Sequence, residues 1–141
     1  MMEQSNFIEK WSRWELAPGL DPKYYLKDLV NDFDGLKLRL ISDCDNTSGI
    51  DLLFKSAWAY RVSDESFRLG TMYQLKLKYG IDFHTEWTFF KVDNSEYLDW
   101  FFKESDGISA AYEMAHYCLM GLESIVDIAA SEDPVVKLIK L

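Results

Sequence analysis

The spacing of apolar residues changes along the chain and predicts a mixture of helices and strands. Near the N-terminus, Phe7, Trp11 and Trp14 recur at i, i+4 and i+7, which is one stripe of a helix. Asn6 is a suitable N-cap for this stripe, and Pro18-Gly19 would end it. We therefore expect a helical N-terminal region.

The segment 22–33 fits two different elements. Asp21-Pro22 is typical of a helix start, and a helical face would follow. That face would consist of Tyr25, Leu26, Leu29, Val30 and Phe33. Asp34-Gly35, however, is also typical of a tight hairpin turn, which would make 24–33 a strand. On periodicity we favour the helix and keep the strand as the alternative.

Beyond this segment the apolar period becomes two. Between residues 36 and 40, leucines alternate with basic residues, which predicts a half-buried strand. The polar residues 43–49 predict a turn, and residues 50–62 form another extended run. Because that run is longer than a usual strand, we expect a bend or bulge near Lys55-Ser56.

The second half of the chain contains the clearest single element. Residues 86–92 predict a strand, and a helix near 95–106 follows with a favourable polar cap. Residues 115–121 and 124–130 predict a closing hairpin, whereas residues 65–80 give no clear pattern. The sequence thus predicts an α+β fold with one antiparallel sheet of about 5–6 strands.

The size and composition of the chain fit one domain that spans residues 1–141. Hydrophobic residues make up 48% of the 141, which is enough for a sizeable core. No apolar run is long enough for a membrane helix, and the N-terminus lacks a secretory signal pattern. The two cysteines have no CxxC spacing, so we expect a cytoplasmic protein with reduced thiols.

The net charge of −9 is unevenly distributed along the chain. From Ile81 to Leu141, 12 acidic residues face only four basic ones. Such a field repels the phosphates of nucleic acids and anionic membranes, so we expect neither as a partner. It suits association with a basic protein.

The segment LRLISDCDNTSG carries the motif that most suggests chemistry. Asp43, Asp45 and Thr47 after an apolar strand resemble the nucleophile loop of the haloacid-dehalogenase phosphatases over about nine residues. The resemblance implies phosphoryl transfer with a magnesium ion. The next segment is extended instead of a crossover helix, and no later strand ends in paired aspartates. The spacing of an EF-hand calcium loop also fails, so we interpret the segment as an acidic turn.

The cysteine and histidine residues give no predicted site. His116 and Cys118 would share one face of a strand, where a Cys–His pair is geometrically conceivable. The apolar run around them indicates packing in the core instead. His84 and Glu86 could share a strand face but lack further metal ligands. We therefore predict no catalytic residue, no metal site and no cofactor.

A partner-binding surface is the remaining hypothesis. The segment 93–113 places carboxylates around the predicted helix, and Trp11 and Trp14 could dock a partner. The acidic residues of this hypothesis are Asp93, Glu96, Asp99, Glu104, Asp106 and Glu113.

The overall make-up loosely resembles small acidic bacterial immunity proteins. The ending AHYCLMGLESIVDIAASEDPVV also resembles a segment of uncharacterised bacterial proteins. The first resemblance implies an inhibitor that occludes a basic partner such as a toxin. Two alternatives stay open: a small-ligand binder or enzyme with an unrecognised site, and a structural or assembly subunit. The sequence is also compatible with a homo-oligomer.

Overall fold

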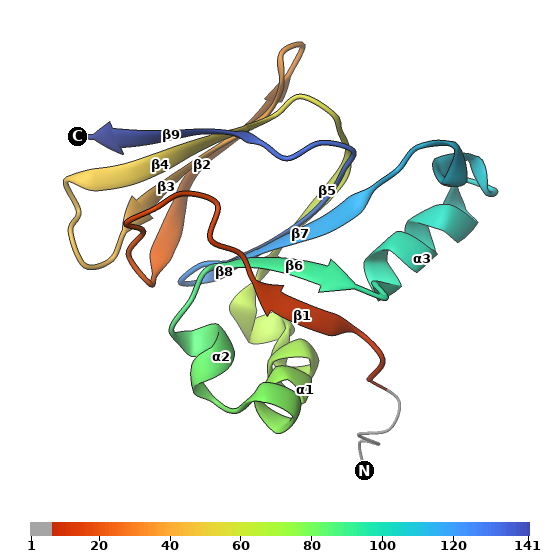
Figure 1. The fold of residues 1–141 in the computed structure, drawn as a ribbon, viewed down its shortest axis with the longest axis horizontal. Coiled ribbons are helices and arrows are strands. Elements are labelled where there is room, and N and C mark those ends of the chain that lie inside the picture. Colours follow the sequence, from red (N-terminus) through yellow and green to blue (C-terminus); the bar gives the residue numbers. More distant parts are fainter. Residues whose placement is uncertain (1–6) are drawn as a thin grey trace.

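The computed structural model describes residues 7–141 as two antiparallel β-sheets with helices beside one of them (Figure 1). The strands are β1 (Lys10–Arg13), β2 (Tyr24–Asp32), β3 (Gly35–Ser42), β4 (Ser48–Phe54), β5 (Ala57–Asp64), β6 (Phe89–Asp93), β7 (Ala115–Met120), β8 (Ser124–Ala130) and β9 (Val135–Lys140). The helices are α1 (Leu69–Tyr79), α2 (Asp82–Thr85) and α3 (Glu96–Glu104), with 3-10 turns η2 (Glu65–Phe67) and η3 (Ile108–Ala111).

The α+β class and the antiparallel pairing are confirmed, but the expected single sheet of five or six strands is wrong. One sheet has the order β1-β6-β7-β8-β5, and the other has the order β2-β3-β4-β9. The main core lies between them, where the alternating leucines of β3 meet inward side chains of β7 and β8. The alternation found in the sequence therefore reports which face of β3 is buried.

A bent two-stranded ribbon joins the two sheets, with β4 and β5 along one side and β8 and β9 along the other. Strands β4 and β5 are separated only by Lys55 and Ser56, yet β4 pairs with β9 in one sheet and β5 pairs with β8 in the other. At the corner, the amide of Ser131 donates to the carbonyl of Ser56 over 3.2 Å. The predicted bend is thus present. Trp58, just past it, is 49% exposed.

The predicted N-terminal helical region is wrong within the described residues. Trp11 lies in β1, which pairs with β6, and it is the one buried residue of this four-residue strand. The helical spacing of the aromatic residues thus coincides with a short strand followed by a loop. The proposed cap at Asn6 lies outside the described residues.

The segment 22–33 contains strand β2, so the helix that we favoured is wrong and the strand alternative is right. The pairing of β2 with β3 shifts register between Leu26 and Asp28, which is a β-bulge. The bulge brings Leu26 and Leu29 to the same inner face, although they are three residues apart. A bulged strand has therefore produced the i, i+3 spacing of a helix. Gly35 then turns the chain with a φ of +128°.

Helices α1 and α2 cover the outer face of the five-stranded sheet. Leu75 of α1 is fully buried against Phe90, Cys118 and Ile125, which belong to strands of that sheet. Residues 65–80, which gave no clear pattern, thus form η2 and α1. Among residues 7–141, no helix combines the length and apolar character that a membrane span requires.

Helix α3 was predicted correctly. Ser95 caps its N-terminus by accepting a hydrogen bond from the amide of Leu98, and Gly107 follows its C-terminus with a left-handed φ of +82°. Within the helix, Tyr97 is buried, whereas Phe102 is 45% exposed.

Candidate functional site

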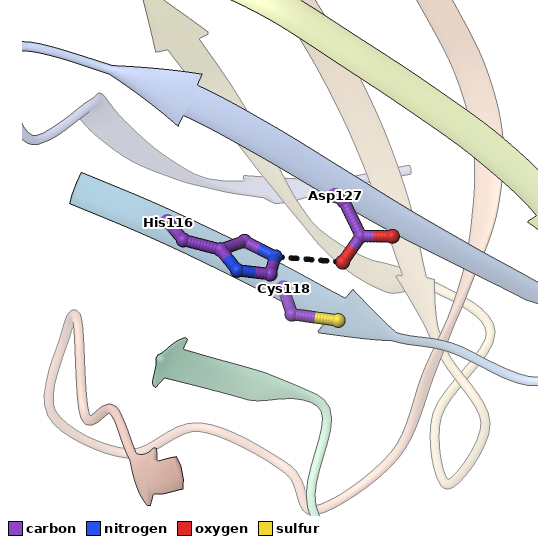
Figure 2. A group of neighbouring side chains, drawn as sticks. All are labelled: His116, Cys118 and Asp127. Atoms are coloured by element: carbon purple, nitrogen blue, oxygen red, sulfur yellow. Dashed lines mark hydrogen bonds and ion pairs between the residues drawn. The ribbon is translucent and has the colours of Figure 1, made fainter. Parts of the chain in front are cut away.

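A buried polar centre lies on the helix-facing side of the five-stranded sheet (Figure 2). Cys118 of β7 stands directly opposite Asp127 of β8, and His116 lies one side-chain position away on the same face of β7. All three residues are buried, with side chains at most 2% exposed for His116 and Asp127. Polar side chains at such depth must find partners within the protein.

The hydrogen bonds of His116 form an ordered chain that begins at helix α3. The amide of Leu98 donates to Ser95 Oγ over 3.0 Å, and Ser95 Oγ lies 2.7 Å from His116 Nδ1. On the other side, His116 Nε2 lies 2.7 Å from Asp127 Oδ1. Because a carboxylate only accepts, Nε2 carries the proton, and the serine hydroxyl then donates to Nδ1.

The second oxygen of Asp127 binds two arginines. Asp127 Oδ2 accepts from Arg61 Nε over 2.8 Å and from Arg68 Nη1 over 2.7 Å. Burial alone would raise the pKa of Asp127, but the hydrogen bond from His116 and the arginine charges outweigh it and hold that pKa well below its usual range. Asp127 is therefore a stable buried carboxylate with both oxygens occupied.

This centre is poorly arranged for nucleophilic chemistry. Burial, followed by the charge of Asp127, raises the pKa of the Cys118 thiol well above its usual value, so the sulfur stays protonated. Ser95, Asp127 and His116 invert the order of a serine-hydrolase triad, since the serine contacts Nδ1 and the carboxylate contacts Nε2. The serine hydroxyl is also buried and acts as a helix cap.

A metal ion also fits these residues poorly. One ligand atom each of His116, Cys118 and Asp127 lies within 4.8 Å of the other two. A divalent ion would have to displace the hydrogen bond between His116 and Asp127, deprotonate the thiol and tolerate the guanidinium of Arg68 close by. The arrangement serves instead to tie α3, β7, β8 and β5 together.

The second candidate is the surface around helix α3, which Figure 1 shows extending beyond the end of the five-stranded sheet together with η3. All six predicted carboxylates are exposed, and Lys103 is the single basic residue of the segment 93–114. Large apolar side chains stand among them and are 45–67% exposed: Trp100, Phe102, Ile108 and Tyr112. We call these ten residues the α3 surface: Asp93, Glu96, Asp99, Glu104, Asp106, Glu113, Trp100, Phe102, Ile108 and Tyr112.

The buried centre and the α3 surface are connected through Arg61. Its guanidinium, which is bound to Asp127, lies over the ring of Tyr97 at 4.5 Å from the centroid. Tyr97 in turn stacks on Trp100 with an interplanar angle of 8°. Helix α3 is thus held at its cap by Ser95 and in its first turn by Tyr97.

No protein-family model, no curated protein and no solved structure gives a significant match to this chain.

The two tryptophans of the hypothesis do not belong to the α3 surface. Trp11 is 4% exposed and donates its indole N–H to Glu9 over 3.2 Å. Trp14 is half-buried and packs against Tyr117 with ring centroids 5.0 Å apart. Both contribute to packing, so we leave them out of the proposed partner-binding residues.

The sequence showed little sign of the buried centre beyond His116 and Cys118. Asp127 is the one charged residue within the apolar strand SIVDIAA, and a lone carboxylate in such a strand indicates a buried partner. That partner set includes Arg61 and Arg68, which are more than fifty residues away in the chain, so no local spacing reveals it.

The acidic turn and the His84–Glu86 pair, which the sequence offered as candidate sites, do not form a binding site. Asp45 accepts from the amide and hydroxyl of Thr47 in the exposed turn between β3 and β4, as an acidic turn predicts. His84 lies in α2 and Glu86 follows it, so the proposed strand pair is wrong.

Lys23 is a lysine that the sequence did not single out. It donates to the carbonyls of His84, Trp87 and Met120 over 2.6–2.9 Å. Burial lowers the pKa of Lys23 to about 8, but all three of its ammonium protons are used in these bonds. Lys23 therefore fastens the start of β2 to the segments around α2 and β7 and leaves no free amine.

Proposed function

We propose that this chain is an acidic protein-binding module that uses the α3 surface to occlude a basic partner protein. The observation that carries the proposal is the gathering of six exposed carboxylates around half-exposed aromatic side chains, with Lys103 as their single basic neighbour in that segment. Lys103 is paired with Asp99 at 2.9 Å, so these two charges largely cancel and the other five carboxylates supply the negative field. An inhibitor of the immunity kind, acting on a basic toxin, is the form of this function that the composition favours.

The physical argument combines steering with anchoring. Carboxylates that are not neutralised raise the association rate with a basic protein, and this effect weakens as salt screens the field. Aromatic side chains such as Trp100 and Tyr112 supply the apolar contact that makes an encounter last. Their faces also attract arginine and lysine side chains of the partner.

The α3 surface is prepared for binding before a partner arrives. Tyr97 and Ser95 fix the helix against the sheet, and Trp58 packs against Tyr112 in a tilted arrangement with ring centroids 4.7 Å apart. Side chains that are already ordered lose less conformational entropy when a complex forms. This argument favours a pre-formed docking surface.

The test is a charge-reversal experiment. The partner is first captured from the source cells at about 50 mM NaCl, where screening is weak, and is then purified. Its association rate is measured with the wild-type chain and with a variant that carries four substitutions: Glu96→Lys, Asp99→Lys, Glu104→Lys and Asp106→Lys. We expect the association rate to fall at least about tenfold.

A matched control separates the α3 surface from net charge. Its four substitutions lie at exposed positions away from α3 and change the net charge equally: Glu15→Lys, Asp43→Lys, Glu86→Lys and Glu132→Lys. The control should slow association much less than the α3 variant at the same salt. Equal effects of the two variants, or binding that salt does not weaken, would refute the proposed role of the α3 surface.

A further inference from the structure

The outer face of the four-stranded sheet carries an apolar surface that no helix among residues 7–141 covers. Helices α1, α2 and α3 all lie beside the other sheet (Figure 1). On the outer face, Val30 is 49% and Val135 is 52% exposed. A hollow of about 390 Å³ lies over this face, between β2 and β9. Exposed apolar surface of this kind on a sheet is typical of an interaction site.

A row of alternating charges crosses all four strands of this face. The register places Asp28 beside Arg39, Arg39 beside Asp51, and Asp51 beside Lys137. Arg39 and Asp51 form a two-pronged ion pair, with Nε–Oδ1 and Nη2–Oδ2 distances of 2.8 Å each. From β2 to β9, the row is therefore negative, positive, negative, positive.

The next row along the strands is mostly apolar. It runs from Val30 through Lys37 and Leu53 to Val135, again one residue from each strand. On the outer face, the charged row thus lies between this row and a row of Tyr25, Ile41, Gly49 and Ile139, all perpendicular to the strands.

We propose that a second copy of this chain packs on this face, related by a two-fold axis that runs parallel to the strands. Such an axis reverses the order of each row, so that Asp28 meets Lys137 of the second copy and Arg39 meets its Asp51. The same operation brings Val30 to Val135 of the second copy. Each charge of the charged row then faces its opposite. In the second row, Lys37 faces Leu53 of the second copy and keeps its ion pairs with Asp32 and Asp34 of its own chain. A two-fold axis along the rows would instead oppose like charges throughout.

The area of the face sets the strength of this dimer. Four strands about 4.8 Å apart and six residues of about 3.3 Å each cover roughly 400 Å² per copy before side chains are counted. A total of about 800–1,000 Å² is at the small end for a specific interface, so the dimer should be weak and salt-sensitive. The α3 surface lies beside the other sheet and stays free in this dimer.

The test is sedimentation equilibrium at low salt over a wide range of protein concentration. The wild-type mass should rise from the 16.5 kDa of one chain toward twice that value as concentration increases. In a dimer of Asp28→Lys, two lysines face each other at both ends of the charged row. In a dimer of Lys137→Asp, two aspartates face each other at the same places. Each single variant should therefore lower the dimer population at least about tenfold.

Combining the two substitutions gives the decisive result. A chain with both Asp28→Lys and Lys137→Asp has complementary ends again and should dimerise like the wild type. An equimolar mixture of the two single variants should form heterodimers, because each then meets its opposite charge. Repulsion within one chain, such as Asp28→Lys would cause beside Arg39, cannot produce this rescue by mixing.

A second pair of variants controls for net charge. Lys10→Asp and Glu86→Lys lie at exposed positions away from the four-stranded sheet and should leave the mass curve unchanged. A chain that stays at 16.5 kDa at all concentrations would overturn the proposal. A dimer that the single variants do not weaken, or that mixing does not restore, would overturn it as well.

Discussion

Asp127 is the residue on which the buried polar centre depends, because its two oxygens bind His116, Arg61 and Arg68 at once. Asp127→Asn removes the charge but keeps the shape, and leaves the arginines without their counter-charge. We expect the free energy of unfolding to fall by about 2–4 kcal/mol, the lower part of the range for broken buried pairs, since Arg61 is half exposed. Urea unfolding measures this, and Glu132→Gln, at an exposed position, should change little.

The same residue predicts how stability depends on pH. The pKa of Asp127 is lower in the folded chain than the ordinary value of about 4 in the unfolded chain. The contribution of ionised Asp127 to the free energy of unfolding is therefore fully present above about pH 4 and is lost as the pH falls below that value. The wild-type chain should lose stability between about pH 4 and pH 2 more steeply than Asp127→Asn. Parallel curves for the two proteins would contradict the lowered pKa.

At the residue scale, the sequence could predict which positions are apolar but not what surrounds a polar one. The acidic turn at Asp45 and the cap at Ser95 depend on neighbours within three residues, and both were predictable. The role of Asp127 depends on Arg61 and Arg68, which only the folded chain brings near. Trp11 was assigned to a partner surface because an aromatic stripe looks the same in the sequence whether it faces a core or a partner.

Helix α3 is the element that joins the core to the proposed binding surface, and Ser95 holds its N-terminus. Ser95→Ala removes both the cap for the Leu98 amide and the donor to His116 Nδ1. We expect a loss of about 1–3 kcal/mol in unfolding free energy. Ser95→Thr keeps the hydroxyl and should retain most of the stability. Equal losses in both variants would show that packing at this position matters more than the hydroxyl.

The turn between β2 and β3 gives a second prediction at this scale. Gly35 has a φ of +128°, and a Cβ placed on it would lie 2.5 Å from the carbonyl oxygen of Phe54. Gly35→Ala should therefore destabilise the chain by about 1–3 kcal/mol. Gly70, in helix α1, has open space around it, and Gly70→Ala should stabilise by about 0.5–1 kcal/mol. Thermal unfolding of the two variants should shift in opposite directions.

Elements with a regular pattern were predictable, and elements with an irregular one were not. Helix α3 follows its period, and strands β7 and β8 are continuous apolar runs on either side of a turn, so all three were found within a few residues. Strand β2 was misread because its bulge between Leu26 and Asp28 adds one residue to the inward spacing. The division into two sheets was also missed, since strand pairing over long distances leaves no local pattern.

At the scale of the whole molecule, the two sheets share one core and should unfold together. Phe54 of the four-stranded sheet packs against Tyr117 of the other, with ring centroids 5.2 Å apart, and Tyr24 similarly meets Phe89. The ribbon of β4-β5 and β8-β9 also passes through both sheets. Neither sheet can lose its inner face without exposing that of the other, which makes partial unfolding costly.

This cooperativity can be measured because the tryptophans report on one sheet only. All five lie in or beside the five-stranded sheet or in α3. Tryptophan fluorescence in urea should therefore give the same unfolding free energy as the slowest amide exchange in β3 of the other sheet. Leu52→Ala, a fully buried site in the four-stranded sheet, should lower both values equally by about 2–5 kcal/mol. A loss seen only in the β3 amides would mean that the four-stranded sheet opens independently, and the shared core would then not couple the two sheets.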